Sequence, residues 1–228
     1  MITHHDYTAD LAPGPTVEST DPRVMSYVED VVAGIEQDTK RAVAVYYAIR
    51  DGILYDPYSA DISVAGLKAT TVLKDRRGWC VSKAILLAAC CRALGIPARL
   101  GYADVRNHLS TEKMRQRMKT NVFYWHGYTA LYLDDRWVKA TPAFNIELCE
   151  KFGLKPLEFN GRDDSIYHAF DQAGNRHMEY LHDRGQFLEP PIKAMRRTFD
   201  EYYPGWPDTS DATEVDFDGE VADEMATR

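Results

Sequence analysis

The segment from Val81 to Leu94 is almost entirely apolar and follows directly on Arg77-Gly78-Trp79-Cys80. It stops at Gly95-Ile96-Pro97, where glycine and proline end a helix. A helix with no polar face must be buried, so we expect this segment at the centre of the fold. Cys80 then opens the helix, where unpaired N–H groups and the positive end of the helix dipole stabilise a thiolate. Gly78 is expected to let the chain turn sharply and to admit a close neighbour.

Size and composition are typical of a single globular domain. The 228 residues are 45% hydrophobic and 27% charged, which is ordinary for a protein with a substantial core. No run is long and apolar enough to span a membrane, and residues 1–6 lack the basic and apolar regions of a secretion signal. We therefore expect a cytoplasmic protein that does not bind membranes.

The net charge of −8 is concentrated at the C-terminus. Residues 208–228 contain eight acids and one base, so the rest of the chain is close to neutral. A nucleic-acid partner needs a basic face, and this balance does not support one. The segment Arg106–Lys119 is the exception, with five bases against one acid. We expect the acidic tail to dock on this segment beside the functional site.

The order of the predicted elements indicates an α+β domain. Asp21 is expected to cap the first helix, with Pro22 at its first position. We expect one domain over residues 1–205 and a disordered acidic tail over 206–228. Helices are predicted over 22–35, 39–51 and 80–94, then strands at 98–103, 123–133 and 137–141, a hairpin over 166–181 turning at 173–175, and a last helix after Pro191.

A cysteine nucleophile needs a base that takes its proton and later returns it to the leaving group. His126 is the best candidate for this base. It lies in the aromatic segment Phe123–Tyr128, which favours a strand, and strands hold catalytic groups rigidly. Imidazole titrates near neutrality and therefore serves both tasks.

The remaining cysteines and histidines favour structural roles. Cys90 and Cys91 lie on the apolar stretch and are expected in the core. His177 and His182 lie five apart, which matches no known ligand spacing. No CxxC pair, EF-hand loop, HExxH, P-loop or GxGxxG occurs in the chain, so we expect no metal, no disulfide and no cofactor.

Several motifs match one family in the right order. Gly78-Trp79-Cys80, the run Arg92–Arg99, His126-Gly127-Tyr128 and Thr141-Pro142 resemble the core of the transglutaminase-like superfamily, over residues 39–145. The resemblance implies a papain-like core, with N-terminal helices packed on an antiparallel sheet. It also implies acyl transfer from an amide through a thioester, with Cys80 as the nucleophile and His126 as the base.

The third catalytic position departs from the family pattern. The family usually has aspartate before the proline, where this chain has Thr141. A hydroxyl accepts a hydrogen bond from imidazole but does not offset the imidazolium charge as a carboxylate does. Three alternatives follow. Thr141 orients His126 weakly, or Asn145 does so as in papain-like enzymes, or a carboxylate such as Asp163 or Asp164 folds over the site.

The tetrahedral intermediate needs hydrogen-bond donors aimed at its oxyanion. The backbone N–H of Cys80 is the obvious donor. Trp79 either adds its indole N–H or walls the site against water. Without the family motif, a tryptophan is more often a packing residue than part of a binding site.

The leading hypothesis is a cysteine-dependent enzyme that hydrolyses or transfers an acyl group of a peptide, protein or small amide substrate. Hydrolysis is favoured over crosslinking because no accessory domain is visible, and a deamidase or glycan-removing amidase is an alternative on the same core. A non-catalytic alternative is a binding or scaffold module that has lost the carboxylate. An active pair predicts fast alkylation of Cys80 by iodoacetamide well below the usual thiol pKa of about 8.5.

Overall fold

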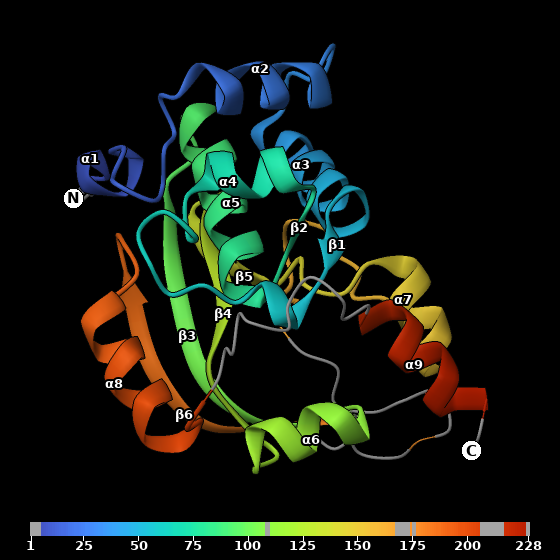
Figure 1. Ribbon diagram of the computed structural model, residues 1–228. Helices are drawn as coiled ribbons and strands as arrows, with labels where there is room; N and C mark the ends of the chain where they lie inside the picture. Colours follow the sequence, from blue (N-terminus) through green and yellow to red (C-terminus); the bar gives the residue numbers. More distant parts are fainter. Residues whose placement is uncertain (1–5, 108–109, 167–173, 175–176, 206–216, 227–228) are drawn as a thin grey trace.

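One four-stranded antiparallel sheet carries the fold, with the helices arranged around it (Figure 1). The computed structural model describes residues 6–107, 110–166, 174, 177–205 and 217–226. The predicted α+β class is confirmed. The strand order is β5-β4-β3-β6, formed by β3 (Ala98–Asn107), β4 (Val122–Leu133), β5 (Arg136–Ala140) and β6 (Met178–Phe187).

Helix α5 (Cys80–Ala93) is the buried centre that the apolar stretch predicts (Figure 1). It packs on β4 and β3, and on its other sides it contacts α2 (Pro22–Val31), α3 (Asp38–Gly52) and α4 (Ala69–Asp75). Cys90 and Cys91 are fully buried core residues, as predicted. Each buried leucine or isoleucine of α5 contributes roughly 1.5–3 kcal/mol to stability. Among the described residues, no helix has the length and apolar character needed to cross a lipid bilayer.

The N-terminal elements are anchored by polar contacts. The Asp21 side chain caps α2 by accepting the Arg23 backbone N–H at 2.9 Å, as predicted. The short helix α1 (Thr8–Leu11) is tied to β3 by an ion pair between Asp10 and Arg99, with Nε and Oδ1 2.7 Å apart. The N-terminal arm is therefore fixed on the domain from α1 onward.

A two-stranded parallel ribbon leads into the cysteine helix. β1 (Leu54–Tyr55) pairs with β2 (Arg77–Gly78), which places Tyr55 beside Gly78. The 3-10 helix η1 (Pro57–Ser59) follows β1. Gly78 is part of a strand and does not adopt a positive φ, so the predicted sharp turn is wrong. The predicted close neighbour is present, because a Cβ on Gly78 would lie 2.6 Å from Ser82 Oγ.

The hairpin between β4 and β5 forms as the sequence predicts. Its two turn residues, Asp134 and Asp135, have φ values of 46° and 64°. Positive φ at both central residues gives a turn whose twist matches the two strands, and aspartate tolerates this conformation. The turn sets the register that pairs Leu133 with Arg136.

The second predicted hairpin is only partly within the described residues. Its turn and most of its first arm fall on residues 167–176, of which the structure describes only Gly174. The second arm forms β6, which runs from Met178 to Phe187 and pairs antiparallel with β3. Since β3 would otherwise expose an edge of unpaired N–H and C=O groups, pairing with β6 satisfies them.

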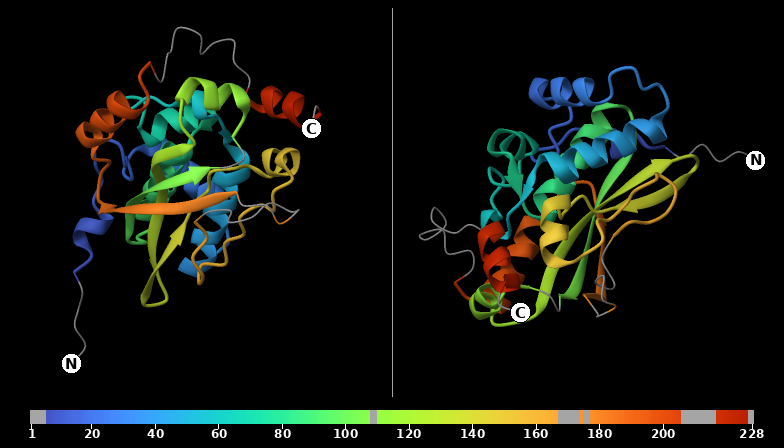
Figure 2. Two further views of the ribbon diagram at one scale, coloured as in Figure 1. Left: turned by 90° about the horizontal axis from the view of Figure 1, so that it is seen from below. Right: turned by 90° about the vertical axis from the view of Figure 1, so that its right-hand side faces the viewer.

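Three further helices surround the end of the sheet where β4 begins. They are α6 (Glu112–Met118), α7 (Ile146–Phe152) and α8 (Ile192–Tyr202). Seen from below, α6 lies between α8 and the C-terminal helix α9 (Phe217–Ala226) (Figure 2, left). This arrangement brings α6 and α8 beside the N-terminus of α5.

Residues 217–226 correct the prediction of a disordered tail, because they form helix α9. Phe217 is buried and packs edge-on against the Tyr55 ring. The basic segment binds this helix as predicted: Lys113 Nζ lies 2.7 Å from Glu220 Oε1, and Arg115 Nη2 lies 3.6 Å from Glu224 Oε1. A buried aromatic anchor and opposite charges explain why this acidic segment is ordered.

Candidate active site

Cys80 and His126 line the same cavity, although separate segments of the chain supply them. Cys80 is 7% exposed at the N-terminus of α5, and His126 is 6% exposed on β4. The cavity measures about 40 Å³. Its other lining residues are mostly aromatic or apolar: Tyr55, Pro57, Ala60, Trp79, Met114, Met118, Phe123, Tyr124, Phe199 and Tyr203.

The two segments meet because β4 carries a glycine at the point of contact. A Cβ on Gly127 would lie 2.9 Å from the Cα of Val81 and 3.2 Å from its backbone nitrogen. Any larger residue would push strand and helix apart. The Gly127 backbone also hydrogen-bonds to the Cys80 sulfur. The Cys80 sulfur therefore contacts the residue directly after His126.

Burial determines the ionisation of the cysteine in this closed cavity. It raises the pKa of the Cys80 thiol to about 11, while backbone hydrogen bonds from Gly127, Val81 and Cys80 itself lower it. The expected stabilisation by the helix N-terminus is present but smaller than the desolvation of the charged form. The expectation of a depressed thiol pKa is therefore wrong for this state. At neutral pH Cys80 is a protonated thiol.

The cavity is too small to hold a substrate. A volume of about 40 Å³ holds about one water molecule, whereas pockets for small-molecule ligands measure roughly 300–1,000 Å³. Met114 and Met118 on α6 and Phe199 on α8 are all buried and form part of the wall. A substrate carbonyl reaches the sulfur only after side chains of these helices move.

Thr141, the first candidate for the third position, does not line this cavity. Its backbone is engaged on both sides: the N–H donates to the Ser165 carbonyl at 2.8 Å, and the carbonyl accepts the Tyr46 hydroxyl at 3.3 Å. Its hydroxyl is buried and makes no hydrogen bond within the described part of the chain. The structure thus brings Thr141 into the core without bonding it to His126.

The other candidates also lie outside the cavity wall. Asn145 precedes α7, where its Oδ1 accepts the Tyr55 N–H at 3.1 Å and its Nδ2 donates to Glu147 at 2.8 Å. Asp164 is exposed and accepts the Lys139 N–H at 2.8 Å, at the edge of β5. Asp163, likewise exposed, accepts a hydrogen bond from the Asn160 side chain. Neither carboxylate folds over the site.

Trp79 precedes Cys80 in the chain and forms part of the cavity wall. It precedes α5, lines the cavity and packs edge-on against Phe199, with ring centroids 6.1 Å apart. Its indole N–H is buried and has no hydrogen-bond partner among the residues the structure describes. A buried donor of this kind can donate a hydrogen bond to a ligand atom that enters the cavity.

Lys83 was missed by the sequence reasoning. It is fully buried on α5, and its ammonium donates to the carbonyls of Arg50 at 3.0 Å, Ile53 at 2.6 Å and Ala143 at 2.7 Å. These bonds tie the end of α3 and the segment after β5 to helix α5. The available signal was a lysine near the start of an almost entirely apolar helix, because a buried ammonium needs several acceptors.

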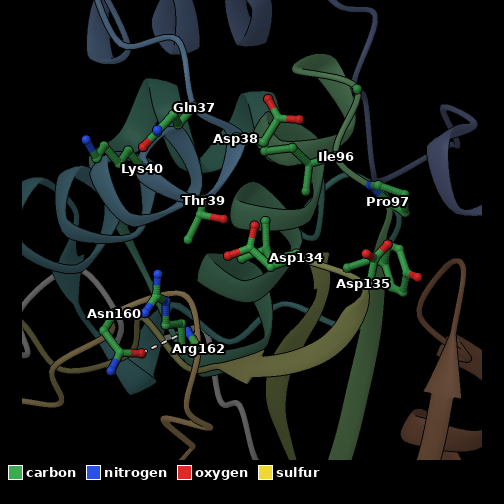
Figure 3. Close-up of a pocket in the computed structure, with 13 residues that line it drawn as sticks. Gln37, Asp38, Thr39, Lys40, Ile96, Pro97, Asp134, Asp135, Asn160 and Arg162 are labelled. Atoms are coloured by element: carbon green, nitrogen blue, oxygen red, sulfur yellow. Dashed lines mark hydrogen bonds between the residues drawn. The ribbon is translucent and has the colours of Figure 1, made fainter.

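A larger hollow of about 890 Å³ lies elsewhere and has different chemistry (Figure 3). Its wall includes Asp38, Asp134 and Arg162, and it contains no cysteine or histidine. It borders Gly95–Pro97, just beyond the C-terminus of α5, about 20 Å from Cys80 at 1.5 Å per helical residue. Within the described ranges, no group of three or more His, Cys, Asp or Glu residues is arranged to hold a metal ion.

Similarity to a known family covers the part of the chain that carries Cys80 and His126. A family model described as the transglutaminase-like superfamily matches residues 25–142. A solved structure of a proposed cysteine protease from Cytophaga hutchinsonii has a TM-score of 0.49 and 18% identity, over 81% of this chain and 56% of that chain. A proposed protease from Parabacteroides distasonis ATCC 8503 has a TM-score of 0.40 and 15% identity, over 59% of this chain and 26% of that one. This chain thus spans little more than half of the first structure's length, and no curated protein matches it in sequence.

Proposed function

The protein belongs to the transglutaminase-like superfamily, whose model matches more than half of its residues, and we propose that it is a cysteine-dependent enzyme acting on amide or peptide carbonyls. One observation carries the proposal. Cys80 and His126 line one cavity at the N-terminus of α5, and the Gly127 backbone bonds to the sulfur. A thiol beside an imidazole is the arrangement that nucleophilic catalysis requires.

The first half of the reaction begins from the thiol. When a carbonyl carbon approaches, the Cys80 S–H proton passes to the His126 imidazole as the new C–S bond forms. General-base removal is needed because burial raises the thiol pKa to about 11. The imidazolium then gives this proton to the leaving amine as the C–N bond breaks, which leaves a thioester on Cys80.

Two donors are suited to the oxyanion of the tetrahedral intermediate. One is the backbone N–H of Cys80, at the start of α5. The other is the Trp79 indole N–H, which is buried at the cavity without a partner among the described residues. Donors held in a water-excluded site stabilise developing charge more strongly than donors in water.

Water resolves the thioester in the second half of the reaction. His126 takes a proton from the attacking water, a C–O bond forms, and the C–S bond breaks as the proton returns to sulfur. The products are a carboxylic acid and the free thiol, so the overall reaction is hydrolysis. An amine in place of water gives transfer.

The test is turnover and acyl-enzyme trapping on the full chain. We expect the protein to hydrolyse components of a mixed peptide digest, with a thioester on Cys80 detected by intact mass after an acid quench. Cys80→Ser and His126→Ala should each reduce the rate at least 1,000-fold, as expected when members of a catalytic unit are removed. Cys149→Ser is the matched control, because Cys149 is also a buried thiol outside any disulfide but does not line the cavity.

A binding or scaffold module is the second candidate, favoured by the closed cavity and the protonated thiol. It predicts no turnover and no acyl-enzyme. It also predicts that His126→Ala leaves the reaction of Cys80 with iodoacetamide unchanged. Both results together would replace the catalytic proposal.

A further inference from the structure

His126 directly follows an irregularity in β4. In the pairing with β3, Ala103 lies opposite His126 and Val105 lies opposite Phe123, so Asp104 alone faces two residues, Tyr124 and Trp125. This is a β-bulge, which adds one residue to a strand and re-aims the side chains beside it. Trp125 within it has a φ of +62°, a conformation that bulky residues rarely adopt.

The bulge changes which side chains face the cavity. In a regular strand, residues 123 and 126 point to opposite faces because side chains alternate. Here Phe123, Tyr124 and His126 all line the cavity with Cys80. Loss of the extra residue from the pairing would shift the alternation by one position and turn His126 relative to the residues before it.

An ion pair holds the bulge on the side of β3. The Asp104 carboxylate accepts the Trp125 backbone N–H at 3.1 Å. Arg184 binds the same carboxylate with two hydrogen bonds, Nε to Oδ1 at 2.5 Å and Nη2 to Oδ2 at 2.8 Å. The Arg184 guanidinium also lies over the Trp125 ring, 4.4 Å from its centroid. One arginine thus contacts both the residue with positive φ and the carboxylate that binds its amide.

Arg184 itself is an extra residue in the neighbouring strand. Tyr102 pairs with Gly185 and Ala103 pairs with Asp183, so Arg184 has no partner of its own on β3. The bulges of β4 and β6 therefore lie on opposite edges of β3, near the same position along that strand. The Arg184 side chain, from the bulge in β6, contacts the bulge in β4.

Helix α8 leads to a residue that holds the rest of the bulge. The Tyr203 hydroxyl accepts the Tyr124 N–H at 2.7 Å and donates to the Val122 carbonyl at 2.7 Å. Both amides of the bulge are therefore bound by side chains, one by Asp104 and one by Tyr203. Arg184 and Tyr203 lie outside the segment that the family model matches, so the later part of this chain completes the support.

We propose that Asp104 and Arg184 are positioning residues that set the direction of His126 toward Cys80 by holding Trp125 in its positive-φ conformation. This inference rests on the proposed function, because its expected consequence is a change in the rate of proton transfer between Cys80 and His126. Strained backbone persists only where the surroundings over-determine it. Three contacts provide these constraints. They are the Asp104 carboxylate on the Trp125 amide, the two Arg184 hydrogen bonds to that carboxylate, and the contact of Arg184 with the Trp125 ring.

The test compares Asp104→Asn and Arg184→Gln with a matched control in the full chain. The control is Glu179→Gln, which removes a second ion pair between the same two strands, where Arg106 Nη1 lies 3.1 Å from Glu179 Oε2. The first readout is the imidazole NMR signals of His126, assigned by their loss in His126→Gln, and their titration with pH. The second readout is the rate at which Cys80 reacts with iodoacetamide at pH 8.

We expect both neutral variants to move the His126 signals and their titration midpoint, and to slow the reaction of Cys80 on the order of 10- to 100-fold, as small misplacements of catalytic groups do. Glu179→Gln should change neither readout. Folded variants with the wild-type His126 titration and the wild-type rate would overturn the proposal. If the neutral variants do not fold, Arg184→Lys decides, since it keeps the charge and loses the two-pronged contact. An unmoved His126 in folded Arg184→Lys also overturns the proposal.

The two readouts separate this inference from the proposed function. The NMR titration reports where His126 lies whether or not the protein turns over a substrate. A displaced His126 in the variants of a chain without turnover would support the positioning role and reject the enzyme.

Discussion

Gly127 lies so close to Val81 that a β-carbon on the glycine would sit 2.9 Å from the valine Cα. This contact joins β4, which carries His126, to α5, which begins at Cys80. It involves the backbone of Val81, which cannot rotate away as a side chain could. Gly127→Ala should therefore separate Cys80 from His126 and destabilise the fold by about 1–3 kcal/mol, the usual range for overpacking. Urea unfolding and the peptide-hydrolysis rate measure the two effects. Gly153→Ala is a poor control because of its positive φ, so Gly52→Ala, with only an arginine side chain nearby at 3.6 Å, serves instead.

Alkylation of Cys80 should be slow at neutral pH and should rise about tenfold for each pH unit. The reason is that burial raises the pKa of the thiol to about 11, and only the thiolate reacts. Iodoacetamide labelling of the full chain between pH 7 and 10, read by peptide mass, checks this. A rate that levels off below pH 8 would mean that the thiolate forms in the closed state.

The same thiol should make the folded state less stable in alkaline solution. Its pKa in the folded protein lies above the unfolded value near 8.5, so the unfolded state loses the proton first. The stability that the protonated, buried thiol contributes is fully present below about pH 8.5. It is lost as the pH rises toward 11, and the total loss is about 3 kcal/mol. Cys80→Ser should show a flatter decline of unfolding free energy over this range than wild type. Parallel curves for the two proteins would contradict the assignment.

Removing residues 206–228 should increase the reaction rate of Cys80 several-fold at low salt. Helix α9 pairs with Lys113 and Arg115, and these residues lie on α6, whose Met114 and Met118 wall the cavity. Without α9, α6 is held less firmly. Charge screening should reduce the difference between the two proteins at 1 M salt.

The control for this truncation is Glu29→Gln, which removes an exposed acid on α2 without touching α6. The rate of Cys80 labelling by iodoacetamide is measured at pH 9 in 20 mM and 1 M salt for the wild type, the truncated chain and Glu29→Gln. Equal rates for wild type and the truncated chain at both salt concentrations would show that α9 does not restrain the wall.

Lys83→Met should lower the free energy of unfolding by about 2–4 kcal/mol. The substitution keeps the aliphatic stem but leaves three carbonyls without the ammonium that they bind, and buried acceptors without donors are costly. Lys40→Met, at an exposed lysine on α3, is the matched control. Chemical unfolding measures both, and a loss below 0.5 kcal/mol for Lys83→Met would show that the three bonds add little.

The elements that carry Cys80 and His126 were predictable because their signals are local. An apolar segment between Cys80 and Gly95 has one stable outcome, a buried helix. An aromatic run before a turn at Asp134 likewise favours a strand that returns in a hairpin. Family motifs added the pairing of Cys80 with His126, which spacing alone does not encode.

The remaining features depend on contacts between distant residues. Asp104 and Arg184 are separated by 80 positions, and nothing in either neighbourhood marks them as partners. In our proposal the bulge at Trp125 depends on both residues, so local propensity alone predicts a regular strand there. Helix α9 was missed for a related reason, since an acidic segment reads as disordered until a basic surface binds it.

Burial of Cys80 also limits the access of oxidants to its sulfur. Peroxide attacks thiolates that solvent can reach, and Cys80 in this state is neither ionised nor exposed. Under the proposed function, whatever movement admits a substrate also admits an oxidant, so we expect irreversible oxidation of Cys80 mainly during turnover.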